Sequence, residues 1–183
     1  MQSSLSDNEL VEQVLQGQKD AFSILVDRYR QKVFRTAIGF LHNSDDAEDL
    51  TQEIFIKAWK ALPSFNKKSA FSTWLYRLSV NKAINQTRKN KLKAFTRINE
   101  EVTNTFSDDN KTDGEITQKE KSTEIKKAIN RLNSKQKKAF ILFYYQELNM
   151  KEVAEILNMT PKATESLIFR ARKNLQKKLT DRM

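Results

Sequence analysis

Only three glycines and two prolines interrupt the 183 residues of this chain. Glycine and proline are the residues that most often end helices and shape the tight turns between strands. Between them Lys, Glu, Leu, Ala and Gln predominate, and these residues are strong helix formers. The sequence therefore predicts an all-α protein, and its length allows one ordinary domain or two small ones.

The composition argues against an enzyme or a metalloprotein. The chain has no cysteine and a single histidine, His42, so it has no disulfide framework and no residue set for a zinc site or a catalytic triad. No glycine-rich phosphate loop or strand-borne pair of acids supports a nuclease or another enzyme, so we expect no catalytic residue, metal or cofactor. The sequence has neither a signal peptide pattern nor 18 uninterrupted apolar residues, which favours a cytoplasmic protein without membrane insertion.

The net charge of +10 is divided unevenly along the chain. Residues 1–62 carry a net charge of −3, residues 63–98 carry +9 without a single acid, residues 99–124 carry −5, and residues 125–183 carry +9. Because Lys and Arg beside phosphates release counterions, two separated basic blocks suggest two DNA-binding surfaces. A well solvated basic helix is the alternative for either block alone, but it accounts poorly for the acid-free block.

Three helices are expected in the first half of the chain. Apolar residues recur at steps of three and four over residues 20–41, which is typical of an amphipathic helix with a buried stripe. Ser44 is expected to cap a second helix, with an acidic first turn, that runs to about residue 61. A third helix is expected over residues 71–89. Together they predict an N-terminal helical bundle over residues 1–95.

The polar stretch over residues 96–121 has no apolar periodicity and is predicted to be a flexible acidic linker. It leads to a second small domain over residues 122–183, in which Ser134, Asn149 and Thr160 are candidate helix starts. A helix over residues 149–157, a short connection and a helix over residues 161–179 outline a helix-turn-helix.

The last predicted helix has two distinct faces. Ile168, Ala171, Leu175 and Leu179 can face inward. The other side is polar and basic, which is suited to a DNA major groove, and it carries Lys162, Glu165, Ser166, Phe169, Arg170 and Lys173. Any helical hairpin gives a similar outline, so this outer face is what favours DNA binding.

Three segments carry a resemblance to a known family. They are DAEDLTQEIFIKAW at residues 46–59, FSTWLYRLSVNKAINQTRK at residues 71–89 and MKEVAEILNMTPKATESLIFRARKNL at residues 150–175. In this order they resemble the extracytoplasmic-function (group 4) sigma factors of bacterial RNA polymerase. The resemblance implies a protein that binds core RNA polymerase, carries it to promoter DNA, and contacts both duplex and melted strand. It also implies an anti-sigma factor as a common partner.

The first segment places Asp49, Gln52, Glu53 and Ile56 at helical neighbour spacings. By resemblance, this face is the polymerase-binding surface, and its polar residues would dock on the coiled-coil clamp of the largest polymerase subunit. Taken alone, the same pattern fits a solvated helix face whose acids suit the helix dipole.

The second segment resembles the reader of the −10 promoter element. Phe71, Trp74, Leu75 and Leu78 are expected in the core, and an opposite row begins at Thr73. In this row amides can bond exposed base edges while cations neutralise phosphates, and its remaining members are Arg77, Asn81, Asn85, Arg88 and Lys89.

The resemblance assigns strand contact to Asn81, and it assigns capture of a flipped base to the loop of residues 64–72, with Phe65, Lys67 and Lys68. Asn85 departs from the family, in which many members carry Asp, and this puts an inferred contact of that side chain in doubt.

The third segment resembles the reader of the −35 element. The resemblance places Glu165, Ser166 and Phe169 at the bases, and the cations better suited to phosphates are Arg170, Arg172 and Lys173. Lys162 is a further candidate for −35 DNA binding. Glu165 departs from the usual Lys or Arg; it either accepts a hydrogen bond from cytosine or complements the helix dipole. Phe169 either contacts a thymine methyl group or packs on the preceding helix.

The alternative to a sigma factor is a stand-alone helix-turn-helix regulator that binds duplex DNA without joining polymerase. This alternative uses the C-terminal domain but leaves the acid-free block over residues 63–98 unexplained.

Overall fold

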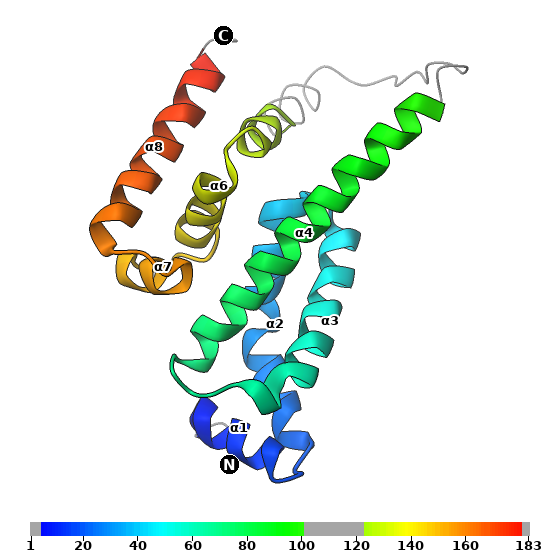
Figure 1. Ribbon diagram of the computed structural model, residues 1–183, viewed down its shortest axis with the longest axis vertical. Coiled ribbons are helices and arrows are strands. Elements are labelled where there is room, and N and C mark those ends of the chain that lie inside the picture. Colours follow the sequence, from blue (N-terminus) through cyan, green and yellow to red (C-terminus); the bar gives the residue numbers. More distant parts are fainter. Residues whose placement is uncertain (1–4, 101–122, 181–183) are drawn as a thin grey trace, which may run out of the picture.

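The computed structural model describes residues 5–100 and 123–180, with side chains described to residues 93 and 179 respectively. These ranges are helical and contain no strand, which confirms the predicted all-α class (Figure 1). The elements are α1 (Asp7–Leu15), α2 (Asp20–Leu41), α3 (Ser44–Ala61), η2 (Leu62–Ser64), α4 (Phe71–Glu100), a helical segment over residues 123–130, α6 (Ser134–Phe140), η3 (Ile141–Tyr145), α7 (Met150–Leu157) and α8 (Pro161–Thr180).

Helix caps fix the boundaries of these elements. The predicted span of α3 is correct, but its cap is Asn43 rather than Ser44, because the Asn43 Oδ1 atom accepts from the Asp46 amide at 2.9 Å. In the same way Asn133, not Ser134, caps α6. In both cases the asparagine one residue earlier reaches an amide that the helix leaves without a partner.

The caps of the helix-turn-helix are those that the sequence predicted. Asn149 accepts from the Glu152 amide at 3.1 Å, and the Glu152 carboxylate accepts from the Asn149 amide at 2.8 Å, which forms a capping box. The Thr160 hydroxyl accepts from the Ala163 amide at 3.2 Å, and Pro161 occupies the first position of α8.

Helix α4 is longer than predicted, because it continues beyond Lys89 to Glu100. No glycine or proline lies between Phe71 and Glu100, so nothing in this stretch interrupts the hydrogen-bond ladder. The helix therefore extends into the predicted linker over residues 96–121, and the rest of that linker, from residue 101 on, lies outside the described residues.

Helices α2, α3 and α4 form a bundle, and α1 packs at its lower end in Figure 1. The fully buried side chains at its centre include Leu25, Val33, Ile54, Phe71 and Leu75. Each such side chain contributes roughly 1.5–3 kcal/mol through burial. Asp7 ties α1 to α2, since its carboxylate accepts from the Arg28 guanidinium and from the Tyr29 hydroxyl, each at 2.5 Å.

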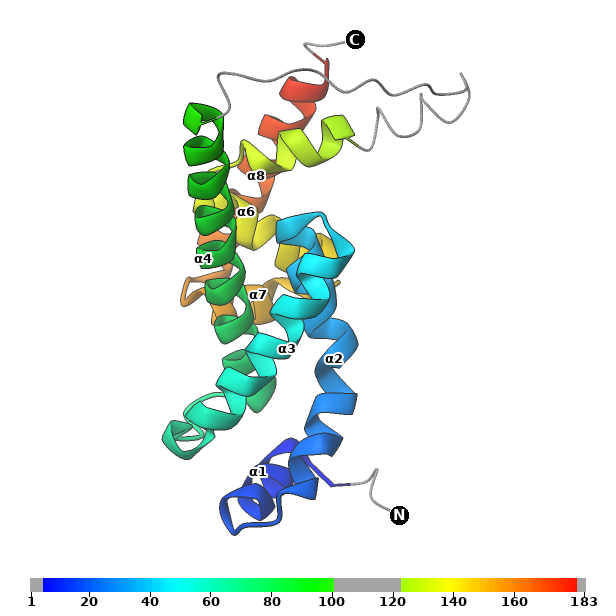
Figure 2. The same cartoon turned by 90° about the vertical axis from the view of Figure 1, so that its right-hand side faces the viewer.

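The C-terminal helices pack against this bundle and share its core (Figure 2). Ile141 and Leu142 of η3 are fully buried, and η3 has the wider π-helical turn. Gly39 of α2 lies so close to Ile141 that a Cβ atom added to Gly39 would be 3.0 Å from the Ile141 Cγ2 atom. A smaller cluster joins residues 123–132 to the inner side of α8.

No helix among the described residues is both long and apolar enough to cross a membrane.

His42 generates the first prediction. It ends α2 with a left-handed backbone, and burial together with the nearby Lys137 ammonium lowers its pKa from 6.5 to about 4. Between these two pH values the unfolded chain binds a proton that the folded chain does not bind. The free energy of unfolding should therefore fall as the pH falls from about 6.5 to about 4.

The variant His42→Asn should show a smaller loss of stability over this pH range, because asparagine tolerates the left-handed backbone and does not titrate. Urea unfolding of both proteins at pH 7 and at pH 4.5 measures the difference. An identical loss in the two proteins would contradict this role of His42.

Candidate nucleic-acid interface

Helix α3 presents an exposed face made of Asp49, Gln52, Glu53 and Ile56, which we call the α3 surface. Ile56 keeps 56% of its area exposed, although it is a large apolar side chain. The opposite side of α3 is buried in the bundle through Leu50, Ile54 and Ala58. The four residues that the sequence places at helical neighbour spacings therefore do share one exposed face.

Two features of this face were missed by the sequence analysis. The Glu53 carboxylate accepts from the Lys82 ammonium of α4 at 2.8 Å, which links the two helices. Trp59 lies one turn beyond Ile56, packs edge-on against Phe22 with ring centroids 5.0 Å apart, and remains 36% exposed. Trp59 follows Ile56 by three residues, and this spacing could have placed Trp59 on the same face of the helix. Nothing in the sequence indicates that Lys82 is the partner of Glu53.

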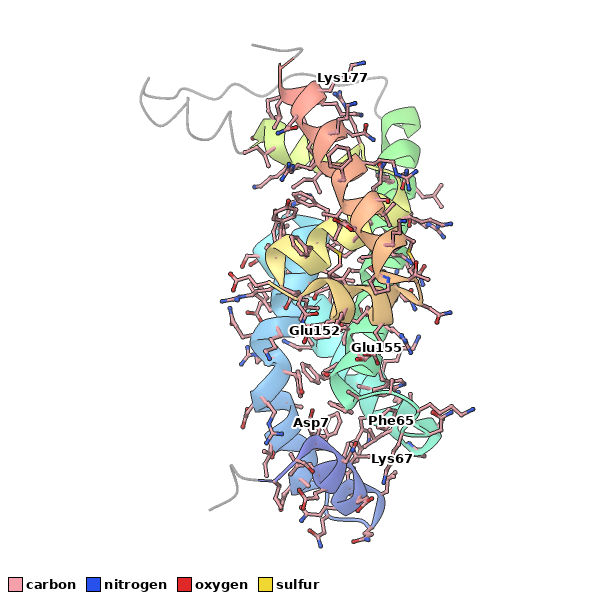
Figure 3. The ribbon with its side chains drawn as sticks, turned by 90° about the vertical axis from the view of Figure 1, so that its left-hand side faces the viewer. Asp7, Phe65, Lys67, Glu152, Glu155 and Lys177 are labelled. Atoms are coloured by element: carbon pink, nitrogen blue, oxygen red, sulfur yellow. The ribbon has the colours of Figure 1, made fainter. Side chains whose placement is uncertain are left out.

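The loop before α4 has a buried aromatic residue and exposed cations. Phe65 is only 6% exposed, and its ring packs 5.2 Å from Trp74 and 6.0 Å from Phe71. Lys67 adopts a left-handed backbone, and its ammonium bonds to the Glu12 carboxylate of α1. Figure 3 shows Phe65 and Lys67 near the end of the molecule where α1 lies. Lys68 is exposed. The Phe65 ring is therefore part of the core and anchors the loop to the start of α4.

The exposed side of α4 carries the row that the sequence predicted, with one correction. Thr73 is buried at 7% exposure, so the row begins at Arg77, which is half-buried. The other members are exposed. We call this set the α4 row, and it consists of Arg77, Asn81, Asn85, Arg88 and Lys89. None of these side chains is surrounded by acids of its own helix, because residues 63–98 contain none.

The N-terminal end of the α4 row, at Arg77, lies against the C-terminal domain. The Arg77 guanidinium donates to the main-chain carbonyl oxygens of Glu155 at 2.6 Å and of Ile156 at 3.2 Å, at the end of α7. Asn81 and Arg77 also line a cavity of about 660 Å³ between α4 and the C-terminal helices. Lys135 and Lys138 of α6 line the same cavity, so its cationic groups come from both domains.

The outer side of α8 is exposed along its length, as predicted. Its members, which we call the α8 surface, are Lys162, Glu165, Ser166, Phe169, Arg170, Arg172 and Lys173. Phe169 is 59% exposed, so it does not pack on the preceding helix. Glu165, Ser166, Phe169 and Arg170 line a shallow hollow on the helix surface. On the inner side Ile168, Ala171 and Leu175 are buried, and Leu179 is partly buried.

Among the described residues, no group of three or more His, Cys, Asp or Glu side chains is arranged to hold a metal ion. The surfaces on α3, α4 and α8 are instead suited to macromolecular contact, because they combine exposed charges and amides with isolated apolar side chains.

Comparisons with known proteins give two matching families and several full-length relatives. The family described as Sigma-70 region 2 matches residues 25–93, and Sigma-70, region 4 matches residues 122–175. The ECF RNA polymerase sigma factor SigW of Bacillus subtilis (strain 168) is 33% identical over 180 residues, which cover 93% of this chain and 95% of SigW. The ECF RNA polymerase sigma-E factor of Escherichia coli (strain K12) is 33% identical over 186 residues, covering 98% and 97% respectively.

Solved structures share the fold of this chain. CnrH in complex with the cytosolic domain of CnrY has a TM-score of 0.70 at 24% identity, covering 96% of this chain and 97% of CnrH. The sigma factor RpoE in complex with the anti-sigma factor NepR from Bartonella quintana has a TM-score of 0.58 at 25% identity, covering 87% of this chain and 96% of RpoE. Because two sigma regions match in order and the sequence relatives match over nearly their whole length, the chain belongs to the extracytoplasmic-function sigma factors, which direct RNA polymerase to promoters.

Proposed function

We propose that this sigma factor uses three separate surfaces at the promoter. The α3 surface binds core RNA polymerase, the α4 row holds the melted strand of the −10 element, and the α8 surface reads the −35 element in the duplex. The observation that carries the proposal is the distribution of charge and exposure: the α3 surface is acidic with an exposed apolar residue, whereas the other two surfaces are mostly basic.

The chemistry of the α3 surface favours a protein partner over DNA. The carboxylates of Asp49 and Glu53 would repel phosphates, whereas a basic protein surface would attract them. Ile56, at 56% exposure, supplies the apolar contact that the centre of a protein interface requires. The coiled-coil clamp of the largest polymerase subunit is the partner that the family resemblance implies.

The α4 row has the donors that a single strand needs. Asn81 and Asn85 can bond base edges that the duplex hides, while Arg88 and Lys89 neutralise phosphates. Lys67 and Lys68 extend the cationic surface into the preceding loop. Phe65 packs under that loop, so we propose that it shapes the base-capturing loop and that a direct contact with a base requires it to leave the core.

The α8 surface combines base-reading and phosphate-binding residues. Glu165, Ser166 and Phe169 line one hollow, where a carboxylate can accept from cytosine and an aromatic ring can contact a thymine methyl group. Lys162, Arg170, Arg172 and Lys173 lie around them and suit the phosphate backbone; all four are exposed.

We also propose the division into a polymerase-binding and −10-reading domain over residues 1–95, a linker over residues 96–121 and a −35-reading domain over residues 122–183. The matched family regions, 25–93 and 122–175, support this division. The protein would act in the cytoplasm without catalytic activity of its own. Since RpoE forms a complex with the anti-sigma factor NepR, a separate anti-sigma protein is a candidate partner here.

The polymerase contact is tested by Asp49→Lys, which reverses an exposed charge at the N-terminal end of the α3 surface. Affinity for core RNA polymerase, measured by fluorescence anisotropy, should fall on the order of tenfold. Asp27→Lys is the matched control, because it reverses an exposed acid on α2 outside the surface. Equal effects of the two changes would rule out a specific role for the α3 surface.

The division of labour on α8 is tested by two substitutions on promoter duplexes. Arg170→Ala should weaken binding to all sequences and make the dependence of log affinity on log salt shallower by about one unit. Glu165→Gln should change the preferred base at one −35 position with little effect on that slope. If the two variants behaved alike in a competitive selection of −35 sequences, the division would be incorrect.

The role of Phe65 is tested by protein stability. Phe65→Ala should lower the free energy of unfolding by about 3 kcal/mol, because it leaves a cavity among Phe71 and Trp74. Lys68→Ala should leave stability nearly unchanged, since Lys68 is exposed in the same loop. Urea unfolding measures both values, and a small effect of Phe65→Ala would show that its ring does not support the loop.

A further inference from the structure

We propose that the cavity between α4 and the C-terminal helices is a binding site for a small, soluble amphipathic anion, namely an aliphatic chain with a phosphate end group. The inference goes beyond the promoter contacts and does not depend on them. It rests on the composition of the cavity lining, in which cationic and amide side chains stand beside an equal number of aliphatic ones.

The cavity has the size and position of a small-molecule site. Helices α4, α6, α7 and α8 all contribute to its lining, and Figure 1 shows how these helices are arranged. Its volume of about 660 Å³ falls in the range of roughly 300–1,000 Å³ that is typical of ligand pockets. Asn158 and Met159, in the turn of the helix-turn-helix, belong to the same lining. A ligand in the cavity would therefore contact both α4 and this turn.

The polar part of the lining is suited to an anion. Lys135 and Lys138 of α6 line the cavity, and their ammonium groups have no hydrogen-bond or ion-pair partner among the residues that the structure describes. Arg77 donates to the end of α7 through its Nε and Nη2 atoms, so its Nη1 atom can still donate to a ligand. No lining residue is acidic, so nothing in the lining neutralises these three cations.

Three cations match a phosphate better than a singly charged group. A phosphate monoester carries a charge of about −1.5 to −2 at neutral pH and offers three acceptor oxygens. Arginine and lysine side chains are the usual partners of such oxygens, because their hydrogen bonds to an anion are reinforced by charge. The amides of Asn81 and Asn158 add further donors to the lining.

The rest of the lining is aliphatic. Val80, Ile156 and Leu167 are buried, and Leu157 and Met159 are partly buried. An alkyl chain that covers these side chains gains affinity with each methylene group that leaves water. The unbranched thioether side chain of Met159 can adapt its shape to such a chain.

The same lining argues against a nucleotide or a DNA strand as the occupant. No aromatic side chain lines the cavity, so it lacks the stacking platform on which bases are usually held. A sugar-phosphate backbone would contact the cations but leave the aliphatic part of the lining uncovered. Dependence of affinity on alkyl chain length therefore separates the proposed ligand from both alternatives.

Isothermal titration calorimetry of the full chain tests the inference with octyl phosphate, hexyl phosphate, inorganic phosphate and adenosine monophosphate, the alkyl phosphates being kept below their micelle-forming concentrations. Octyl phosphate should bind once per chain. Hexyl phosphate should bind on the order of tenfold more weakly, because it buries two fewer methylene groups, and the two compounds without an alkyl chain should bind more weakly still. Equal affinities of octyl phosphate and any other probe, or several molecules of octyl phosphate bound per chain, would overturn the inference.

The position of the site is tested by Lys138→Gln, which removes one cation from the lining but keeps a polar side chain. It should weaken octyl phosphate binding on the order of tenfold, because a charge-assisted hydrogen bond is lost. Lys151→Gln is the matched control, since Lys151 is exposed on α7 and does not line the cavity. Equal losses in the two variants would place the bound anion elsewhere and overturn the inference.

The aliphatic part of the site is tested separately by Met159→Gln, which makes the lining more polar at one partly buried position. This variant should reduce the difference in affinity between octyl and hexyl phosphate several-fold, while its affinity for inorganic phosphate stays within about twofold of the unmodified protein. Urea unfolding checks that each variant is folded. A difference between the two alkyl phosphates that is unchanged in folded Met159→Gln would contradict an alkyl chain in this cavity.

Discussion

The packing of α4 is the constraint on which the rest of the structure depends. One side of this helix supplies Phe71, Leu75 and Val80 to the core of the bundle, and these side chains are nearly fully buried. Burial of that side fixes the rotation of α4 about its axis, and this rotation decides which residues face outward. The cations and amides of the α4 row are therefore aligned by apolar packing on the opposite side. The proposed strand-binding surface therefore needs no rigid loop to hold it.

Local signals predicted much of this architecture from the sequence. The spans of α2 and α3 follow from apolar periodicity, and the capping box at Asn149 and the proline at position 161 fix the two helices of the helix-turn-helix. The exposed faces of α3 and α8 were predicted for the same reason, because a helix with a regular apolar stripe has only one side left for function. The roles of the residues on these faces stay predictions.

The missed features depend on partners that are distant in sequence. Phe65 lies in a loop without periodicity, so its burial against Trp74 cannot be read from spacing. The pairing of Glu53 with Lys82 joins two helices. One hydrogen bond of Arg77 reaches Ile156 of α7, which lies 79 residues further along the chain. Periodicity tells which side of a helix is covered, but it does not tell what covers it. For this reason the sequence predicted two domains without predicting how they pack.

The C-terminal helices and the bundle share a buried apolar core, and hydrogen bonds add to this interface. Its hydrogen bonds join Arg77, Lys137 and Gln146 to main-chain carbonyl oxygens. Burial also lowers the pKa of Lys137 to about 8, which means that the interface holds this ammonium at a desolvation cost. The packing of Ile141 on Gly39 and the burial of the shared apolar core act in the opposite direction and hold the two parts of the chain together.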